Sequence, residues 1–336
     1  MKRERLDSII SNFPEKRIGV VGDLMLDVYL CGKATRISPE APVPVVRVKD
    51  KELRLGGAAN VMLNVITLGG KASAFGVTGN DPNGKAIEKL LAAEGIRNSS
   101  VYPDPQRRTT EKQRVMAGAQ QLVRIDFEDT LPIPAQLREK ITEDIISEIE
   151  KHNLDALIFE DYAKGVLSLE MLQKVIEVAR ANNVMVSLDP HISQLLEVKR
   201  LTLLKPNRSE AFALAGTYCS DPAESAENDS ALIDVAGKLI KRWEPDYLLI
   251  SLGPQGLALF AKDGSRHFIP TQAREVYDVS GAGDTVMAAF TLSLAGGADG
   301  IEAAIISNHA AGIVVGKIGT ATVSTEELRE NFKYDK

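Results

Sequence analysis

A glycine-rich turn followed by an aspartate occurs in the segment DVSGAGDTVMAAF at residues 278–290. Gly281, Ala282 and Gly283 form the turn, and the residues that follow are almost all apolar or small, which is typical of a buried helix. The first N–H groups of a helix lack intrahelical acceptors and lie at the positive end of its dipole, so they can bind an anion. Asp284 would lie beside that anion, where a carboxylate can take a proton from an attacking hydroxyl group. Alternatively, Asp284 only caps the helix and the glycines only allow tight packing.

A second group of polar residues follows the first predicted strand. Asp23 and Asp27 lie just after an apolar run, and Gly56 and Gly57 precede a helical pattern that contains Asn60. Ligands of open α/β sheets bind at the carboxyl ends of the strands. Carboxylate and amide groups together suit a polyhydroxylated ligand such as a sugar. Glycine pairs before a helix also occur in purely structural turns.

A third motif, Asn207-x-x-Glu210, directly follows a predicted strand. The two side chains are three residues apart and share one helix face, where they can hold water around a magnesium ion. Locally, an N-cap with its capping-box partner is an equally good interpretation. Asp189 also follows a strand and is a further candidate for a site near phosphates.

Strand-like and helix-like segments alternate along most of the chain and must position these residues. Short apolar runs that predict strands lie at residues 17–22, 72–76, 156–159, 184–188, 201–204 and 247–252. Amphipathic helical patterns separate them. Strands buried on both faces and joined by helices indicate an α/β fold with a mostly parallel sheet.

Two segments interrupt this alternation. Residues 39–48 (PEAPVPVVRV) contain three prolines and then alternate, which predicts an edge strand. Residues 107–127 predict a hairpin that turns near Gly118. Together the two segments can form a small β-sheet that acts as a lid, although they can also be two ordinary surface insertions.

The composition excludes several classes of protein. The chain has 336 residues, of which 44% are hydrophobic and 26% are charged, and a formal net charge of -6. These fractions are those of a globular protein, and the acidic balance argues against nucleic acid as a partner. No apolar run approaches 18 residues, so we expect no membrane association. The two cysteines give no disulfide framework and the N-terminus has no signal peptide, so we expect a cytoplasmic protein.

Taken together, DVSGAGD, the glycine motif at 56–60 and Asn207-x-x-Glu210 resemble the signatures of the ribokinase-like (PfkB) carbohydrate kinases. The resemblance covers almost the whole chain. It implies a three-layer α/β/α fold with a mostly parallel central sheet and a small β lid. We therefore expect a single kinase domain over residues 1–336, with lid segments at about 28–55 and 105–127. The resemblance also implies an enzyme that uses ATP and Mg²⁺ to phosphorylate a sugar.

The same resemblance implies roles for individual residues. Asp284 matches the catalytic base, and Gly281, Ala282 and Gly283 match an anion hole. The positions implied to bind the sugar substrate are Asp27, Gly56, Gly57 and Asn60. Asp23, Asp161, Lys112, Arg114 and Lys164 are further candidates for substrate binding, and the family signature does not fix the three cations among them. Those implied to lie around the nucleotide are Asn207, Arg208, Ser209, Glu210, Ser251, Gly253, Gly256 and Asn308. Those implied near Mg²⁺ are Asn207 and Glu210, acting through water, with Asp189 as a further candidate.

Within this family the chain most resembles the kinases of D-glycero-β-D-manno-heptose 7-phosphate. The matching segments are ISPEAPVPVV, GGAANV, QQLVRID, DYAKGVL and AAGIVVGKIGTATVS. The implied reaction phosphorylates the anomeric hydroxyl to give the 1,7-bisphosphate, for ADP-heptose and lipopolysaccharide-core precursors. The alternative is a ribokinase-like kinase for another sugar, sugar phosphate or nucleoside. Our candidates for binding the 7-phosphate are Lys112, Arg114 and Lys164, with Arg36 behind them.

Three further expectations follow. The chain contains no H-x-G-H, so we expect no nucleotidyltransferase domain within it. Val279 stands where the family usually has threonine, so we do not expect a monovalent-cation site. A lid that exposes Val43, Val45, Val46 and Val48 would be prone to association, so we predict a homodimer formed through the lids.

Overall fold

The central sheet of the computed structural model has nine strands, and the structure describes residues 1–273 and 275–332. In spatial order the strands are β13 (Arg266–Ile269), β12 (Leu257–Ala261), β11 (Tyr247–Ser251), β10 (Leu203–Leu204), β9 (Met185–Asp189), β8 (Ala156–Glu160), β1 (Arg17–Gly22), β4 (Lys71–Gly79) and β5 (Arg97–Asp104). Neighbouring strands from β11 to β5 are parallel, and β12 and β13 add an antiparallel edge. The predicted mostly parallel sheet is confirmed, although β10 is shorter than the predicted strand at 201–204.

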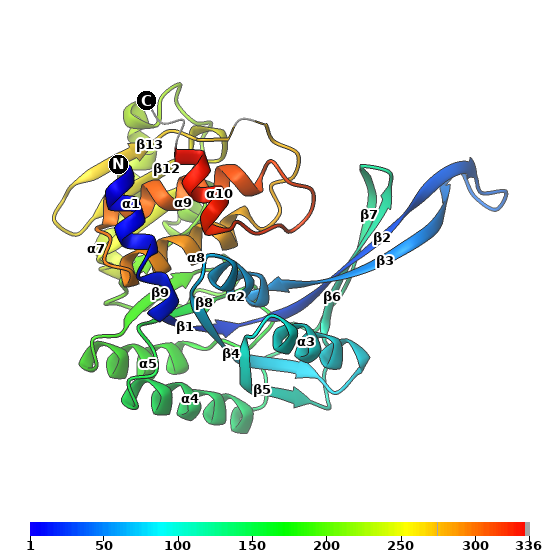
Figure 1. Ribbon diagram of the computed structural model, residues 1–336, viewed down its shortest axis with the longest axis horizontal. Coiled ribbons are helices and arrows are strands. Elements are labelled where there is room, and N and C mark those ends of the chain that lie inside the picture. The colour runs from blue at the N-terminus through cyan, green and yellow to red at the C-terminus, as the bar shows by residue number, and fades with distance from the viewer. Residues whose placement is uncertain (274, 333–336) are drawn as a thin grey trace.

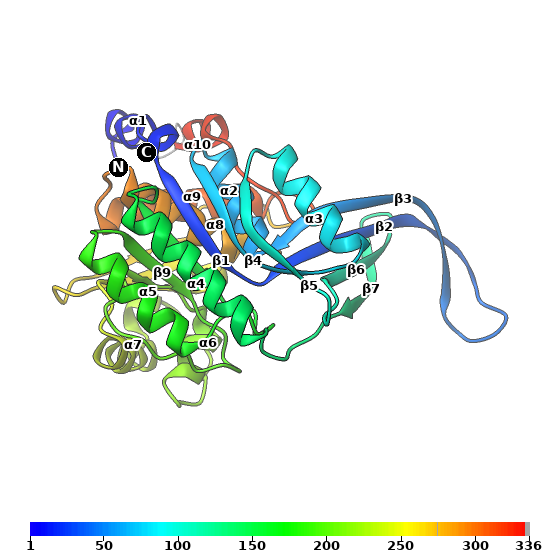
Figure 2. The same cartoon turned by 90° about the horizontal axis from the view of Figure 1, so that it is seen from below.

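Helices cover both faces of this sheet, so the fold has three layers (Figures 1 and 2). One layer contains α1 (Arg3–Ile10), α2 (Ala58–Thr67), α3 (Pro82–Ala93), α8 (Ala282–Ala295), α9 (Gly300–Val314) and α10 (Thr325–Asn331). The other contains α4 (Ala135–Glu150), α5 (Leu169–Ala181), α6 (Arg208–Leu214) and α7 (Ser230–Trp243). Alternate strand residues enter opposite cores: Val20 packs in the first and Val21 in the second. No helix in the described part of the chain has the length and apolar character needed to cross a membrane.

A separate four-stranded sheet forms the lid, in the order β3-β2-β6-β7. Its strands are β2 (Leu24–Ile37), β3 (Pro44–Gly57), β6 (Thr110–Ala117) and β7 (Gln120–Phe127). The hairpin predicted at 107–127 is confirmed, and Gly118 turns it with a φ of +63°. The edge strand predicted at 39–48 begins only at Pro44, because residues 39–43 form the bend that joins β2 to β3. The β2–β3 ribbon extends well beyond the rest of the molecule (Figure 1).

The lid sheet has one polar and one apolar face. Asp27 is in register with Arg54 on β3 and with Lys112 on β6, so these side chains share a face. Alternate positions give the opposite face, and the large apolar side chains exposed there are Leu53, Val123, Ile125 and Phe127. Arg54 and Tyr29, which lie on the polar face, contact the backbone of residues 318 and 320, so this face is turned toward the body of the protein.

Candidate active site

Neighbouring parallel strands bring five polar residues to one edge of the central sheet. Glu160 ends β8, Asp189 ends β9 and Ser251 ends β11, while Asp23 follows β1 and Lys205 follows β10. The N-terminus of α8 lies near the same edge, since Lys205 Nζ would be 3.5 Å from a Cβ on Gly283. The carboxyl edge of an α/β sheet is the usual place for a ligand.

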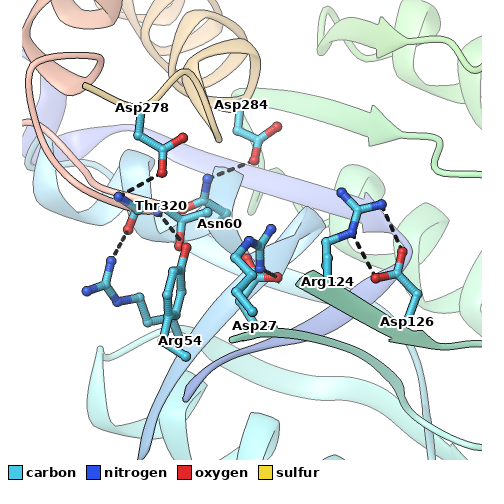
Figure 3. A network of polar contacts seen from close by, with 11 residues as sticks. Asp27, Arg54, Asn60, Arg124, Asp126, Asp278, Asp284 and Thr320 are labelled. Carbon is cyan, nitrogen blue, oxygen red and sulfur yellow. Dashed lines mark hydrogen bonds and ion pairs between the residues drawn. The ribbon is translucent and has the colours of Figure 1, made fainter. Parts of the chain in front are cut away.

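The Asp284 carboxylate is buried and held by two side chains from other elements. Asn60 Nδ2 donates to Asp284 Oδ2 at 2.7 Å, and the Tyr162 hydroxyl donates to Oδ1 at 2.8 Å. Figure 3 shows Asn60 and Asp284 pointing toward each other. Burial raises the pKa of Asp284, whereas the hydrogen bonds from Asn60 and Tyr162 lower it. Both carboxylate oxygens therefore bind side chains outside α8, and Asp284 is more than a helix cap.

The glycine turn before Asp284 has little room for side chains. Gly281 has a φ of +80°, and a Cβ there would lie 2.7 Å from Asn60 Nδ2. Only glycine combines that backbone angle with so close an approach. The helix begins at Ala282, but the N–H of Ala282 donates to the Val279 carbonyl at 3.2 Å. Within the predicted anion hole, the Ala282 N–H is thus already used by the turn.

A buried cation that was not predicted lies below this turn. Lys205 Nζ contacts Asp189 Oδ2 at 2.6 Å, and its side chain is only 4% exposed. Burial by itself would lower the pKa of Lys205, but the Asp189 and Glu160 carboxyl groups raise it above its usual value. Burial, together with Asp189 and Asp284, raises the pKa of Glu160, which favours its neutral form. The ammonium group is therefore charged and next to the anion site.

A cavity of about 630 Å³ opens from this edge of the sheet. The predicted residues that line it are Asp161, Asp189, Asn207, Glu210, Ser251, Gly253, Gly256, Ala282, Gly283 and Asn308. Leu257, Val286 and Val315 contribute an apolar wall. A cavity with one apolar wall and polar groups near a helix N-terminus can accept a nucleotide base and its phosphates.

Two predicted nucleotide-binding residues do not line the cavity. Arg208 pairs with Asp229 at 2.8 Å and stacks on Phe212, so its guanidinium supports the α6–α7 region. Ser209 is exposed, and its hydroxyl donates to Asn207 Oδ1. Residues between Asn207 and Glu210 on a helix point in other directions, and a role of Arg208 and Ser209 in nucleotide binding stays a prediction.

Asn207 and Glu210 form a capping box, one of the two interpretations of their spacing. Asn207 Oδ1 accepts the N–H of Glu210 at 2.9 Å, and Glu210 Oε2 accepts the N–H of Asn207 at 2.7 Å. Among the described residues, no three metal-binding side chains are grouped to hold an ion. Mg²⁺ keeps several of its waters and prefers oxygen ligands. The carboxylates of Glu210 and Asp189, which both line the cavity, fit water-mediated binding of Mg²⁺.

The polar face of the lid closes the other side of the site. Arg114 Nη1 pairs with Asp27 Oδ1 at 2.6 Å, and both side chains are buried. A Cβ on Gly56 would lie 2.9 Å from the Asp27 carboxylate, so glycine is needed where β3 passes Asp27. Arg114 thus neutralises and orients Asp27, and its predicted binding of a phosphate stays a prediction.

The other predicted phosphate-binding cations differ in their contacts. Lys164 pairs with Glu128 at 2.9 Å, whereas Lys112 lies 5.8 Å above the ring of Tyr162 and makes none of the ion pairs found among the described residues. Arg36 is exposed in the outer part of β2, nine residues beyond Asp27 and about 30 Å away along an extended strand. Arg36 therefore lies outside the site of its own chain.

Asp23 and Asp161 have positioning contacts. Asp23 Oδ2 accepts the N–H groups of Tyr162 and Lys164, both at 3.0 Å, so Asp23 holds the loop that carries Tyr162. Gly57 has a φ of +57°, and a Cβ there would meet the Asp23 carbonyl. Asp161 lines the cavity, and its Oδ1 accepts the N–H of Ala163.

The fold and this site are those of a carbohydrate kinase: a buried carboxylate follows a glycine turn at a helix N-terminus, beside the polar face of a second sheet. The profile of the pfkB family of carbohydrate kinases matches residues 15–327. The chain belongs to this family.

Two curated relatives show how far the similarity extends. The chain is 40% identical over 328 residues to the bifunctional protein HldE of Pelobacter propionicus and 42% identical over 328 residues to that of Geobacter metallireducens. Each comparison covers 98% of this chain but 65% of the relative. The chain thus spans about two thirds of the length of the curated relatives it matches.

Solved structures share the fold at low sequence identity. Phosphofructokinase-2 from Escherichia coli, in complex with substrates and products, superposes with a TM-score of 0.77 at 20% identity, covering 95% of this chain and 99% of that one. Ribokinase from Arabidopsis thaliana, complexed with ribose and ATP, gives a TM-score of 0.73 at 20% identity with the same coverage. The predicted ribokinase-like fold is confirmed.

Proposed function

We propose that this protein transfers the γ-phosphoryl group of ATP to the anomeric hydroxyl of D-glycero-β-D-manno-heptose 7-phosphate. The observation that carries this proposal is the position of Asp284, which is held by Asn60 and Tyr162 between an anion-binding turn and a charged lid. Similarity over 98% of the chain to proteins named HldE supports the choice of a heptose.

The proposed reaction uses this chain's residues as follows. Asp284 accepts the proton of the anomeric hydroxyl while the oxygen of that hydroxyl attacks the γ-phosphorus. The bond from the γ-phosphorus to the β–γ bridging oxygen breaks, and ADP leaves. The Gly283 N–H and the Lys205 ammonium stabilise the transferring phosphoryl group. Mg²⁺, held through water by Glu210 and Asp189, would offset the charge of the ATP phosphates. Asp27, oriented by Arg114, binds a sugar hydroxyl.

The 7-phosphate is assigned to the lid. Burial lowers the pKa of Lys112, and the nearby cations Arg124 and Lys164 lower it further, although Asp126 and Asp27 act in the opposite direction. Figure 3 shows Arg124 paired with Asp126 on this part of the lid. A phosphate bound beside Lys112 would relieve the repulsion among these cations.

The apolar face of the lid supports the predicted homodimer. Leu53, Val123, Ile125 and Phe127 are exposed on one face of an open sheet, and a second copy would cover them. Cys31 and Cys219 are free thiols, which supports a reducing compartment such as the cytoplasm.

A panel of acceptors tests the proposed substrate. The panel contains the heptose 7-phosphate, the same heptose without phosphate, fructose 6-phosphate and ribose, and ADP release is measured for each at saturating MgATP. We expect the heptose 7-phosphate to give the highest kcat/KM, at least about 10²-fold above the unphosphorylated heptose, because buried polar groups reject a ligand that leaves them unpaired. A preference for an unphosphorylated sugar would refute the proposal.

A further inference from the structure

A chain of hydrogen bonds connects the lid to the loop between α9 and α10, residues 315–324. Arg54 Nη1, on β3, donates to the carbonyl oxygens of Ile318 at 3.3 Å and Thr320 at 3.2 Å. The Tyr29 hydroxyl, on β2, accepts the N–H of Thr320 at 3.1 Å. Figure 3 shows Arg54 directed at the segment that contains Thr320. Two lid strands thus bind the backbone of one short loop.

The same loop is bound on its other side by the turn that leads to Asp284. Asp278 Oδ2 accepts the N–H of Gly319 at 3.0 Å, and its Oδ1 accepts the N–H of Ser280 at 2.9 Å. Burial by itself would raise the pKa of Asp278, but these N–H groups hold it below its usual value. One carboxylate therefore joins the α9–α10 loop to the residue directly before Gly281.

Gly319 allows the lid to come this close. Its φ is +76°, and a Cβ there would lie 2.5 Å from Arg54 Nη1 and 3.0 Å from the Tyr29 hydroxyl. A side chain at this position would push both lid residues away from the loop. The close approach therefore depends on the absence of a side chain.

Within the described residues, the turn that leads to Asp284 has few other supports. Val276, Tyr277 and Val279 are all strongly exposed, so apolar packing contributes little there. The N–H groups of Tyr277 and Asp278 donate to the Val315 carbonyl, which belongs to the α9–α10 loop. The shape of the turn is thus set by hydrogen bonds to that loop.

Tyr29 also connects this chain of contacts to the sugar side of the site. Its ring lies 4.6 Å from the Arg54 guanidinium carbon and 5.3 Å from that of Arg114, the partner of Asp27. A change in the position of the lid at Asp27 will therefore move Tyr29 and Arg54 as well.

We propose that Arg54 and Tyr29 are positioning residues, which hold the anion-binding turn in its active shape through the α9–α10 loop and Asp278 while the lid is seated. The inference rests on the proposed function only in taking residues 281–283 as the anion-binding turn. Its consequence is that phosphoryl transfer depends on a seated lid, so an open lid leaves ATP bound beside an incomplete site.

The first test measures amide exchange and needs no sugar. Arg54→Gln and Tyr29→Phe remove the lid side chains that contact the loop. Arg17→Gln is the control, because Arg17 also donates to a backbone carbonyl but lies at the N-terminal end of β1, away from the site. We expect the Gly319 and Thr320 amides to exchange about tenfold faster in Arg54→Gln and the Thr320 amide to do so in Tyr29→Phe. Exchange unchanged from the wild type in both variants would overturn the inference.

The second test measures turnover with the best acceptor found in the panel. We expect Arg54→Gln to lower kcat about tenfold and to leave KM for ATP within about twofold, because the substitution does not alter the cavity proposed to hold the nucleotide base. Gly319→Ala should have the same effect. Gly264→Ala is its control, since Gly264 has a φ of +89° but a Cβ there meets nothing within 4 Å. Unchanged kcat in Arg54→Gln and Gly319→Ala would contradict the inference, whichever sugar is the substrate.

Discussion

The proposed phosphoryl-transfer side of the site lies between two helical layers at the edge of a nine-stranded sheet, whereas the proposed sugar-binding side lies on a four-stranded sheet with one exposed face. On the transfer side, Asp284 and Lys205 are buried and each contacts side chains from other elements. On the lid side, Lys112 makes no ion pair among the described residues. The two sides differ in burial, and Lys112 on the lid is a cation without a carboxylate partner among the described residues.

This difference suggests that one side serves phosphoryl transfer and the other serves selection of the sugar. Groups that act on the phosphoryl must be preorganised, because reorganisation during the reaction raises the barrier. Groups that select the sugar can move, because the substrate itself orders them on binding. Substitutions on the transfer side should therefore lower the rate with every acceptor, and substitutions on the lid should change the choice of acceptor.

The largest effect is expected for Asp284→Asn. The amide cannot accept the hydroxyl proton, so kcat should fall by at least about 10²-fold, while the Kd for ATP stays within a few-fold. Stopped assays with the best acceptor and a titration with ATP measure the two quantities. Asp263→Asn, in the exposed turn between β12 and β13, is the control. A kcat near that of the wild type would remove Asp284 from the chemistry.

The next largest effect is expected at the buried ammonium. Lys205→Met alone would leave the Asp189 carboxylate unpaired, so the variant to test is Lys205→Met with Asp189→Asn. We expect kcat to fall by at least about 10²-fold for all acceptors alike, because the double variant removes the ammonium group and also one of the two carboxylates proposed to hold Mg²⁺. Lys241→Met, on the exposed face of α7, controls for loss of a lysine. A fall confined to one acceptor would contradict the division between the two sides.

A smaller effect, visible mainly at low pH, is expected for Asn60→Ala. The hydrogen bond from Asn60 lowers the pKa of Asp284, so its removal raises that pKa. Asp284 must be ionised to act as a base, and the acid limb of the kcat profile should therefore move to higher pH. Turnover should fall on the acid limb and recover at higher pH. An acid limb at the wild-type pH would show that another group controls it.

The smallest effect on turnover is expected for Asp161→Asn, which tests stability. Burial raises the pKa of Asp161 to about 7, so the folded state binds a proton that the unfolded state releases between about pH 4 and pH 7. Asp161 therefore destabilises the fold increasingly as the pH rises through this range. The substituted amide would keep an acceptor for the N–H of Ala163 without charge, and the free energy of unfolding should rise by about 2 kcal/mol at pH 8 but little at pH 4. Denaturant titrations at both pH values measure this, and an equal gain at both would contradict it.

The sequence predicted the transfer side better than the lid side. The glycine turn and the aspartate are contiguous in DVSGAGD, and the strands are short apolar segments. The motif and the strands can therefore be recognised from local sequence. The partners of Asp284 cannot be recognised from local sequence, because Asn60 lies 224 residues away and Tyr162 lies 122 residues away. Only the sheet order brings these residues together.

Charged residues were harder to assign for the same reason. Arg114, Lys164 and Arg208 carry the charge that phosphates need, yet each is paired with a carboxylate that only the fold places beside it. Lys205 is the opposite case, because nothing in its local sequence distinguishes it from a surface lysine. Its burial and its charge depend on Glu160 and Asp189, which end β8 and β9. Pairing between separate elements of the fold is a tertiary property that residue spacing does not encode.

The most direct test of the division between the two sides is a ratio measured in two variants. The ratio compares kcat/KM for the heptose 7-phosphate with that for the unphosphorylated heptose. We expect Lys112→Met to lower this ratio by at least about tenfold, because the proposal has this lysine bind only the distal phosphate. The double variant at Lys205 and Asp189 should lower both values and leave the ratio within about twofold. A ratio unchanged in Lys112→Met, or one that falls equally in both variants, would contradict the account.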